Sequence, residues 1–479
     1  MTNQNASILD RDSLEYARIF SPAVLMDNLP RGFCEFSPTS TPISLVTTSE
    51  AISWLGTLEN EAQTWLKRQG FTGKSGQFAW LEDTEGPRVV VGWDGQAMPS
   101  TLGGLPTKLP EGQYHLAAEV DDNLLIGWGM GAYQFTRYKT VDREPAQVAI
   151  PDTNNRSRIL NIVDAITLGR DLINTPAADM APSNIAAEIE ALGERFGAES
   201  ATTVGDALLD DNCGAIHAVG RAAEDPPCLC KLTWGDPNNP QISIVGKGVT
   251  FDSGGLDLKP ASGMRQMKKD MGGAATAIAL AYAIMAERLP VFLTLLIPAA
   301  ENAVAGNAFR PGDILSTHKG LTVEIDNTDA EGRLLLCDAL SIAAAAEPDL
   351  IIDFATLTGS ARSAVGAEIA AMFATADDVA ADLAAAGDEV ADAVWRMPLH
   401  SSYNYMLDSK VADLVNSAAS PYAGSVTAAL FLQRFVEGCN WVHFDIMAFN
   451  TRNRPGHPEG GEVMGMRSVL KYLEDTYAT

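Results

Sequence analysis

The sequence is short of cysteine, histidine and positive charge, and each shortage excludes a class of protein. Its 479 residues include only six cysteines and six histidines. Six cysteines over this length are too few for a disulfide framework, so reduced thiols are expected. No HExxH pattern is present, and a zinc site built on imidazole groups is therefore not expected.

Positive charge is scarce, because 34 lysines and arginines face 61 aspartates and glutamates, for a net charge of −27. Clustered basic residues are needed to neutralise phosphates, so no nucleic-acid partner is expected, and anionic membrane surfaces are disfavoured too. The longest apolar candidate, Leu289–Ala300, is too short to cross a membrane and contains proline. Met1–Ser13 is polar and has no basic segment followed by an apolar one, so a cytoplasmic location is expected.

The length favours two domains. Val141–Arg156 is polar and punctuated by proline, as linkers often are. We therefore predict a small N-terminal α/β domain over residues 1–150 and a larger C-terminal α/β domain over residues 151–479. In the first domain the pattern predicts helical stretches within Ser49–Gln69. It also predicts strands over Arg88–Trp93, Tyr114–Glu119 and Asn123–Trp128.

Helical and strand patterns alternate through the second domain. The predicted strands are Gln241–Val245, Val291–Ile297, Leu321–Ile325 and Leu350–Phe354, and the predicted helices are Arg158–Asn174, Ser183–Phe196, Gly272–Ala286, Leu334–Ala346 and Asp378–Trp395. Such alternation indicates a mixed, mainly parallel sheet flanked by helices. Ligand sites in such sheets lie beyond the carboxyl ends of the strands.

Two glycine-rich segments carry charged residues at predicted strand ends: 245–273 and 327–334. The first is not a phosphate-binding P-loop, because Gly248 stands where Ser or Thr is required. Its glycine spacing also fails the dinucleotide fingerprint at Phe251. The short run 252–255 faintly resembles a serine-protease loop, but no histidine is placed by a partner motif.

Asp252, Asp270, Asp329 and Glu331 are left as carboxylates that could converge. Crowded carboxylates repel one another and raise their pKa values, and two divalent cations would remove that conflict. Simpler explanations exist for each residue alone. An Asp near Gly is commonly a turn residue, and Asp329 with Glu331 could stabilise the start of a helix.

The two segments closely resemble the leucyl aminopeptidase (cytosol aminopeptidase) family of binuclear metallopeptidases. The octapeptide Asn327–Leu334, with sequence NTDAEGRL, matches the family's hallmark in full. The likeness covers nearly all of residues 155–450 and is looser before them. Further matching segments are Gly131–Lys139, Asp171–Pro176, Pro298–Asn302, Arg310–Asp313 and Ala355–Gly359.

The resemblance implies a binuclear metal-dependent catalytic domain over residues 151–479. One metal would be held by Asp252, Asp329 and Glu331, and the other by Lys247, Asp252, Asp270 and Glu331. A ligating lysine must be neutral, and two nearby cations would depress its pKa. The implied metals are Zn²⁺ or Mn²⁺, two per subunit, with a bridging water or hydroxide that attacks the peptide carbonyl.

Two more residues carry implied catalytic roles. Lys259 resembles the lysine that stabilises charge on the scissile carbonyl, and Arg333 resembles the arginine that holds a bicarbonate acting as general base. The implied activity removes single residues, apolar and Leu-like, from peptide N-termini. The implied assembly is a homohexamer, a dimer of trimers.

The resemblance also implies a pocket for the first substrate residue. Its lining would include a segment near Ile446–Ala448 together with Met267, Asn327, Ala330, Thr356, Leu357 and Gly359. Met447 and Ala448 stand where the family commonly has Ala-Gly, and Asp257 stands where a small neutral residue is common. These departures concern substrate preference rather than the metal site.

Two other functions remain open on the sequence. Binuclear carboxylate sites also cleave phosphoesters. A regulatory or chaperone-like role on the same fold is the second alternative, although a complete set of candidate ligands speaks against it.

Overall fold

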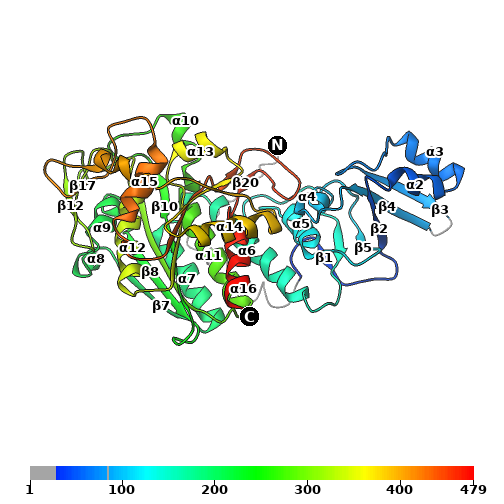
Figure 1. Ribbon diagram of the computed structural model, residues 1–479, viewed down its shortest axis with the longest axis horizontal. Helices are drawn as coiled ribbons and strands as arrows, with labels where there is room; N and C mark the ends of the chain where they lie inside the picture. The colour runs from blue at the N-terminus through cyan, green and yellow to red at the C-terminus, as the bar shows by residue number, and fades with distance from the viewer. Residues whose placement is uncertain (1–28, 84–85, 479) are drawn as a thin grey trace, which may run out of the picture.

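The computed structural model describes residues 29–83 and 86–478, and the polar segment Met1–Ser13 lies outside them. Two sheets dominate the described chain, a smaller one at the right of Figure 1 and a larger one at the left. The smaller sheet has the strand order β1-β6-β5-β2-β4-β3. Its strands are β1 (Phe33–Cys34), β2 (Thr41–Thr47), β3 (Phe78–Asp83), β4 (Gly86–Trp93), β5 (Gln113–Leu116) and β6 (Gln147–Ala149).

The helices of this N-terminal unit lie around its sheet and differ from the sequence prediction in one place. The predicted helical stretches within Ser49–Gln69 are α2 (Ala51–Thr57) and α3 (Asn60–Arg68), which are separate because Leu58 has an extended backbone. The predicted strand Asn123–Trp128 is wrong, since these residues belong to helix α5 (Asp122–Ala132). The Asp121 side chain accepts a hydrogen bond from the Asn123 backbone N–H and caps this helix. The short helix α4 (Pro99–Leu102) packs on α5.

The larger sheet has nine strands, and β9, β11, β14 and β18 form its parallel centre. The order is β16-β15-β18-β14-β9-β11-β8-β7, with β10 paired to β11. The strands are β7 (Glu199–Val204), β8 (Cys228–Trp234), β9 (Gln241–Gly246), β10 (Gly248–Asp252), β11 (Phe292–Asn302), β14 (Leu350–Ala355), β15 (Ala370–Ala374), β16 (Val394–Arg396) and β18 (Trp441–Asp445). Antiparallel pairs at β8 and β15 make the sheet mixed, which confirms the predicted fold class.

Helices cover both faces of the larger sheet, and the apolar side chains of its strands alternate between two cores. Ile244 of β9 packs into one core and Val245 into the other, as the two-residue period of a strand requires. On the first side lie α6 (Arg156–Asn174), α7 (Pro182–Phe196), α11 (Gly272–Ala286), α14 (Asp377–Val390) and α16 (Met466–Tyr477). On the second side lie α9 (Gly214–Gly220), α12 (Gly332–Ala345) and α15 (Gly424–Gln433).

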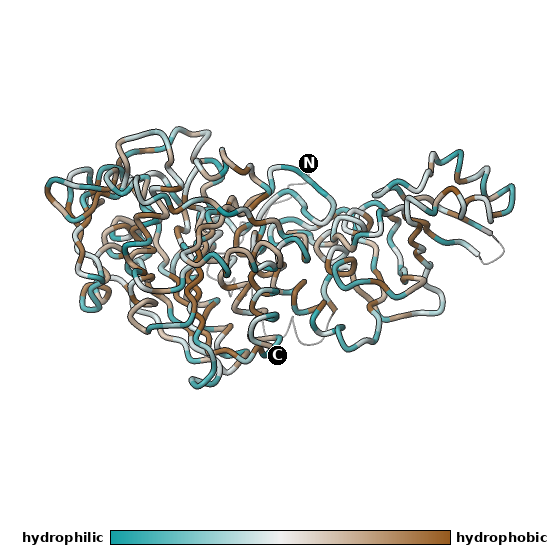
Figure 2. Tube along the Cα trace, in the orientation of Figure 1, coloured by the Kyte–Doolittle hydropathy of each residue, from teal (hydrophilic) through white to brown (hydrophobic). Residues whose placement is uncertain are grey.

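Figure 2 shows the apolar residues gathered along these strands and inner helices, with hydrophilic residues at the loops. Two helix predictions need correction at an end. Helix α14 ends at Val390 rather than at Trp395, because Ala391 takes a left-handed conformation. Ser183 does not cap α7, because the helix begins at Pro182 and its N-cap is Ala181; the Ser183 hydroxyl instead donates to Asp225. Among the described residues, no helix combines the length and apolarity that crossing a bilayer requires.

A buried arginine joins the two units. Arg170 of α6 is fully buried, and its guanidinium donates to the Met130 carbonyl of α5 at 2.7 Å and to the Gly456 carbonyl at 2.9 Å. It also forms an ion pair with Glu462 at 2.9 Å. The same apolar core runs from the smaller sheet through α5 and α6 into the larger sheet. The two sheets are therefore separate, but their packing is continuous.

Candidate metal centre

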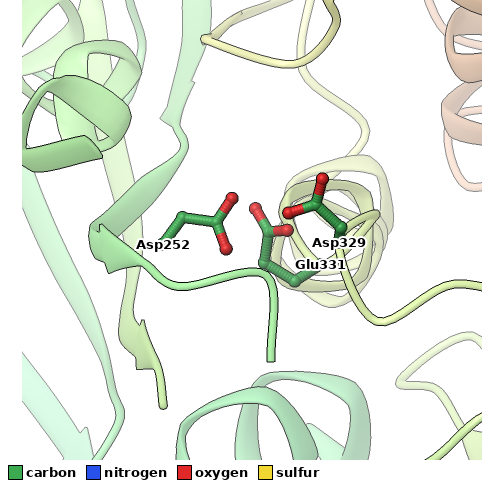
Figure 3. Close-up of side chains that lie close together, drawn as sticks. All are labelled: Asp252, Asp329 and Glu331. Carbon is green, nitrogen blue, oxygen red and sulfur yellow. The ribbon is translucent and has the colours of Figure 1, made fainter. Parts of the chain in front are cut away.

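Three of the predicted ligands meet at the carboxyl end of the larger sheet. Asp252 is the last residue of β10, and Asp329 and Glu331 immediately precede α12. One oxygen from each of the three carboxylates lies within 4.8 Å of the others. Figure 3 shows the Asp252 and Glu331 carboxylates facing each other, with Asp329 alongside. Segments about 80 residues apart in the chain thus supply one cluster.

Lys247 and Asp270 complete the predicted set on the inner side of this cluster. Lys247 follows β9, and its Nζ lies 2.6 Å from Asp270 Oδ2 and 3.1 Å from Glu331 Oε1. The same amine donates to the Thr356 carbonyl at 3.1 Å. All five predicted ligand residues therefore lie together, joined through Lys247 and Glu331.

Two glycines allow this close approach. A Cβ on Gly332 would lie 2.3 Å from Lys247 Cε, so the lysine side chain fits against the start of α12 only when residue 332 has no side chain. Gly254 has φ +89°, and a Cβ there would lie 2.5 Å from the Asp257 carbonyl. The sharp turn after Asp252 is therefore made by glycine.

Lys259 lies on the outer side of the cluster, and it is only half-buried. Its Nζ lies 2.7 Å from Asp252 Oδ2 and also forms an ion pair with Asp329 Oδ1. Four carboxylates thus face the two ammonium groups of Lys247 and Lys259, which leaves a surplus of negative charge in a buried place.

The surplus of negative charge affects the pKa values of the clustered carboxylates. Burial, aided by the Asp252 carboxylate, raises the pKa of Glu331 to about 8 and that of Asp329 to about 6. Burial disfavours the charged form of Lys247, but Asp270, Glu331 and Asp252 together raise the pKa of its amine above the ordinary value. Ligation requires a neutral amine, so cation binding has to reverse that shift.

The residues present fit divalent cations. Glu331 is 2% exposed, and its Oε2 is buried without a hydrogen-bond partner in the described chain. An unpartnered buried carboxylate oxygen is costly unless a cation neutralises it. Carboxylate oxygens with one amine nitrogen suit Zn²⁺ and Mn²⁺ alike.

Arg333 is the second residue of α12 and is largely buried. Its Nη1 donates to the Asn416 carbonyl at 2.7 Å, whereas its buried Nε has no hydrogen-bond partner in the described residues. Burial lowers the pKa of the guanidinium to about 10, against the attraction of Glu331 and Asp445, so the group stays charged at neutral pH. The unpartnered Nε is a fitting donor for a small anion such as bicarbonate.

We expect Arg333→Ala to lower kcat by about a hundredfold or more while metal content stays near that of the parent protein, because proton transfer would be lost but no ligand. Steady-state kinetics and elemental analysis of the same sample measure both quantities. Arg396→Ala is the matched control, since Arg396 is half-exposed and pairs with the surface residue Asp377. Loss of both metals in Arg333→Ala would show that Arg333 is structural.

The predicted substrate residues lie on two loops and at the starts of two short helices beside the ligands. Thr356, Leu357 and Gly359 follow β14, and the Thr356 hydroxyl hydrogen-bonds Asp270 Oδ1 at 2.8 Å. Asn327 and Ala330 belong to the loop before α12, and Asn327 Oδ1 accepts from the Asp329 N–H at 2.8 Å. Met267 begins the 3₁₀ helix η2 (Met267–Met271), which carries Asp270.

Residues that the sequence did not single out hold these loops in place. Asn302 donates to Asp252 Oδ1 at 2.9 Å and to the Thr328 carbonyl at 3.1 Å. Asn416 is fully buried and accepts from the backbone N–H groups of Asp326 and Asn327. Asn302 stands in a segment that resembles the family, and this resemblance could have identified it from the sequence. Asn416 had none, because it stands 89 residues after Asn327 in no recognisable motif.

Two aspartates have similar positioning roles. Asp257 accepts from the Thr328 backbone N–H at 2.8 Å, so this departure from the family pattern ties the loop after β10 to the loop before α12. Asp445 ends β18 and accepts from the Leu357 and Thr358 N–H groups at 3.1 and 3.0 Å. It fixes the loop after β14, on which the predicted substrate residues Thr356 and Leu357 lie.

Comparison with known proteins places this site in a family. The profile of the cytosol aminopeptidase family, catalytic domain, matches residues 167–470, and that of the M17 aminopeptidase N-terminal domain matches residues 41–151. The probable cytosol aminopeptidase of Syntrophotalea carbinolica is 36% identical over 408 residues, which are 81% of each chain. That of Chlamydia caviae is 40% identical over 322 residues, 66% of this chain and 64% of that protein.

Solved structures agree. The crystal structure of the cytosol aminopeptidase from Coxiella burnetii has a TM-score of 0.88 and 44% identity, covering 92% of this chain and 98% of that chain. The bottromycin maturation enzyme BotP in complex with Mn has a TM-score of 0.82 and 32% identity, covering 91% and 99%. The fold and these matches define an α/β metallohydrolase. The chain belongs to the cytosol aminopeptidase family and is a metallo-aminopeptidase, which confirms the resemblance.

Proposed function

We propose that this chain uses two divalent metal ions to hydrolyse single N-terminal residues from peptides in the cytoplasm. The observation that carries the proposal is the convergence of Lys247, Asp252, Asp270, Asp329 and Glu331 around a buried carboxylate oxygen without a partner. When bound, the cations would acidify a water nucleophile and hold the free α-amine of the peptide.

The side chains supply the remaining chemistry in this proposal. Asp252 and Glu331 would each contact both cations, Asp329 one of them, and Lys247 with Asp270 the other. Lys259 is near enough to Asp252 and Asp329 to place its positive charge beside the scissile carbonyl, where it would stabilise the developing oxyanion. Arg333 would hold an anion that accepts the proton from the nucleophile.

Three further features belong to the same proposal. Either Zn²⁺ or Mn²⁺ would serve, and the Mn complex of BotP supports manganese. We place the domain boundary near residue 150, where the smaller sheet ends, with the catalytic domain over residues 151–479. The predicted assembly is a homohexamer, a dimer of trimers. Met267 and Leu357 support the expected apolar first residue, whereas charged neighbours of the pocket favour an acidic one.

Paired assays with Mn²⁺ added to metal-depleted protein test the proposal. We expect hydrolysis of aminoacyl p-nitroanilides and no comparable hydrolysis of p-nitrophenyl phosphate, because an α-amine is the group that fixes the substrate. Chelation should abolish the activity, and added Mn²⁺ or Zn²⁺ should restore it. Faster hydrolysis of the phosphate ester would favour the phosphoesterase alternative, and no metal-dependent hydrolysis of either substrate would overturn the enzymatic proposal.

A further inference from the structure

Lys269 is a buried cation that the proposed mechanism does not use. It lies on η2 between Met267 and Asp270, and its side chain is 2% exposed. Among the described residues no hydrogen bond or ion pair holds its amine. Buried lysines are rare unless something pairs with them.

A second cation lies beside it. Arg362 belongs to α13 (Gly359–Val365), and its Nη2 is 3.6 Å from the point where a Cβ on Gly359 would lie. The guanidinium therefore folds back over the loop that carries the predicted substrate residues. The guanidinium of Arg362 also forms no hydrogen bond or ion pair with the described residues, although its backbone carbonyl accepts from the Gly366 N–H. It is near enough to Lys269 for the two charges to repel each other.

The nearby carboxylates do not neutralise both cations. Asp270 is engaged by Lys247 at 2.6 Å. Asp445 acts electrostatically on both cations but forms an ion pair with neither. Its oxygens accept from the Leu357 and Thr358 N–H groups and from the Thr358 hydroxyl at 2.5 Å. Two cations thus face one committed carboxylate, in a chain whose net charge is −27.

We propose that Lys269 and Arg362 form a subsite for the side-chain carboxylate of the first substrate residue, so that the enzyme favours N-terminal Glu or Asp over Leu. The inference rests on the proposed aminopeptidase function. The position fits, because Lys269 stands two residues after Met267 on η2 and the Arg362 guanidinium lies beside Gly359, and both Met267 and Gly359 are predicted to line the pocket for that residue. An incoming carboxylate would give two otherwise unpaired cations a partner.

The same cations could attract a carboxylate from elsewhere, namely the C-terminus of a short peptide or a free anion. Each source predicts a different dependence. If the bound carboxylate is that of the substrate side chain, the preference for Glu over Leu substrates depends on Lys269; neither of the other two sources predicts this. If the cations bind a peptide C-terminus, the hydrolysis rate depends on whether the terminal carboxylate is free. If they bind a free anion, the hydrolysis rate depends on added salt.

The test measures kcat/KM of the Mn²⁺-loaded full chain on Glu-, Asp- and Leu-p-nitroanilide. We expect the two acidic substrates to exceed Leu in the parent protein. Lys269→Met and Arg362→Leu should each lower the Glu-to-Leu ratio, about ten- to hundredfold for Lys269→Met, the usual worth of a hydrogen bond to a charged group. The ratio cancels any partial loss of metal or folded protein. Lys231→Met, at an exposed position on β8, should leave it unchanged.

The outcomes separate this inference from the proposed function. Hydrolysis of Leu-p-nitroanilide without the acidic substrates, or an unchanged ratio in both variants, would overturn the subsite and leave the aminopeptidase proposal standing. Lys269→Met could instead slow hydrolysis of Leu-Gly but not of Leu-Gly-amide while the Glu-to-Leu ratio stays the same. The carboxylate that these cations bind would then be the C-terminus of the peptide, and the proposed subsite would be wrong. The subsite is also overturned if added formate changes the rate on Leu-p-nitroanilide in the parent protein but not in the variants, while the Glu-to-Leu ratio stays the same in all of them. No hydrolysis of any nitroanilide would instead reject the function itself.

Discussion

Glu331→Gln is expected to lower kcat/KM by at least about a thousandfold. Among the described residues, Glu331 is the carboxylate that both contacts Lys247 directly and lies within the cluster of Asp252 and Asp329. Glutamine keeps the size and shape of the side chain but exchanges one oxygen for an amide nitrogen, which cannot ligate a cation. Because the residue is predicted to touch both metals, the loss of one oxygen disturbs the whole pair.

Kinetics on an aminoacyl nitroanilide at saturating Mn²⁺, together with metal stoichiometry, measure this loss. The metal-free variant should unfold at a temperature close to that of the metal-free parent, because glutamine fills the same space. Glu437→Gln is the control, since Glu437 is exposed and pairs only with Lys319. Near-normal activity in Glu331→Gln would remove Glu331 from the metal site and undermine the two-metal proposal.

Lys259→Met is expected to lower kcat by about a hundred- to thousandfold and to change KM much less, as the loss of an oxyanion-stabilising group does. Lys259 is half-buried at the open side of the cluster, where a substrate carbonyl would enter. Methionine keeps most of the length of the side chain but removes its charge. Steady-state kinetics on the metal-loaded protein give both constants.

The structure offers a competing role for Lys259, because its amine also neutralises Asp252 and Asp329. If neutralisation were its only role, Lys259→Met would bind metal more tightly and keep its kcat. A metal titration beside the kinetics distinguishes the two roles. Lys319→Met, which removes an exposed surface charge, controls for the change of net charge.

The sequence predicted the central fold well because burial dictates it. Helix α11 matches its prediction at both ends, and β9 and β14 each match within one residue. Their residues are apolar enough to identify the core of an α/β sheet without tertiary information. The failure at Asn123–Trp128 has the same origin. A helix buried on all sides shows no apolar face, so a short apolar segment of α5 resembles a buried strand.

The predicted ligands could be found because each stands at a strand end or directly before a helix, within a short motif. Their supporting partners could not. Asn416 contacts Asn327 across 89 residues, and Asp445 contacts Leu357 across 88. Such pairs are made by the folded chain alone and leave no local pattern. The charge of the substrate pocket was missed for a related reason, since Lys269 and Arg362 lie almost a hundred residues apart.

The guanidinium of Arg170 has a consequence for how the enzyme can be divided. A fragment beginning after residue 150 would lack the Met130 carbonyl that receives this buried cation, and it would bare the apolar side of α6 that α5 covers. We expect such a fragment to aggregate rather than to act as a minimal enzyme, because its core would be incomplete and its buried cation would lack one of its partners. Although the profile of the family divides the chain near residue 150, the protein has to be made and unfolded as one piece.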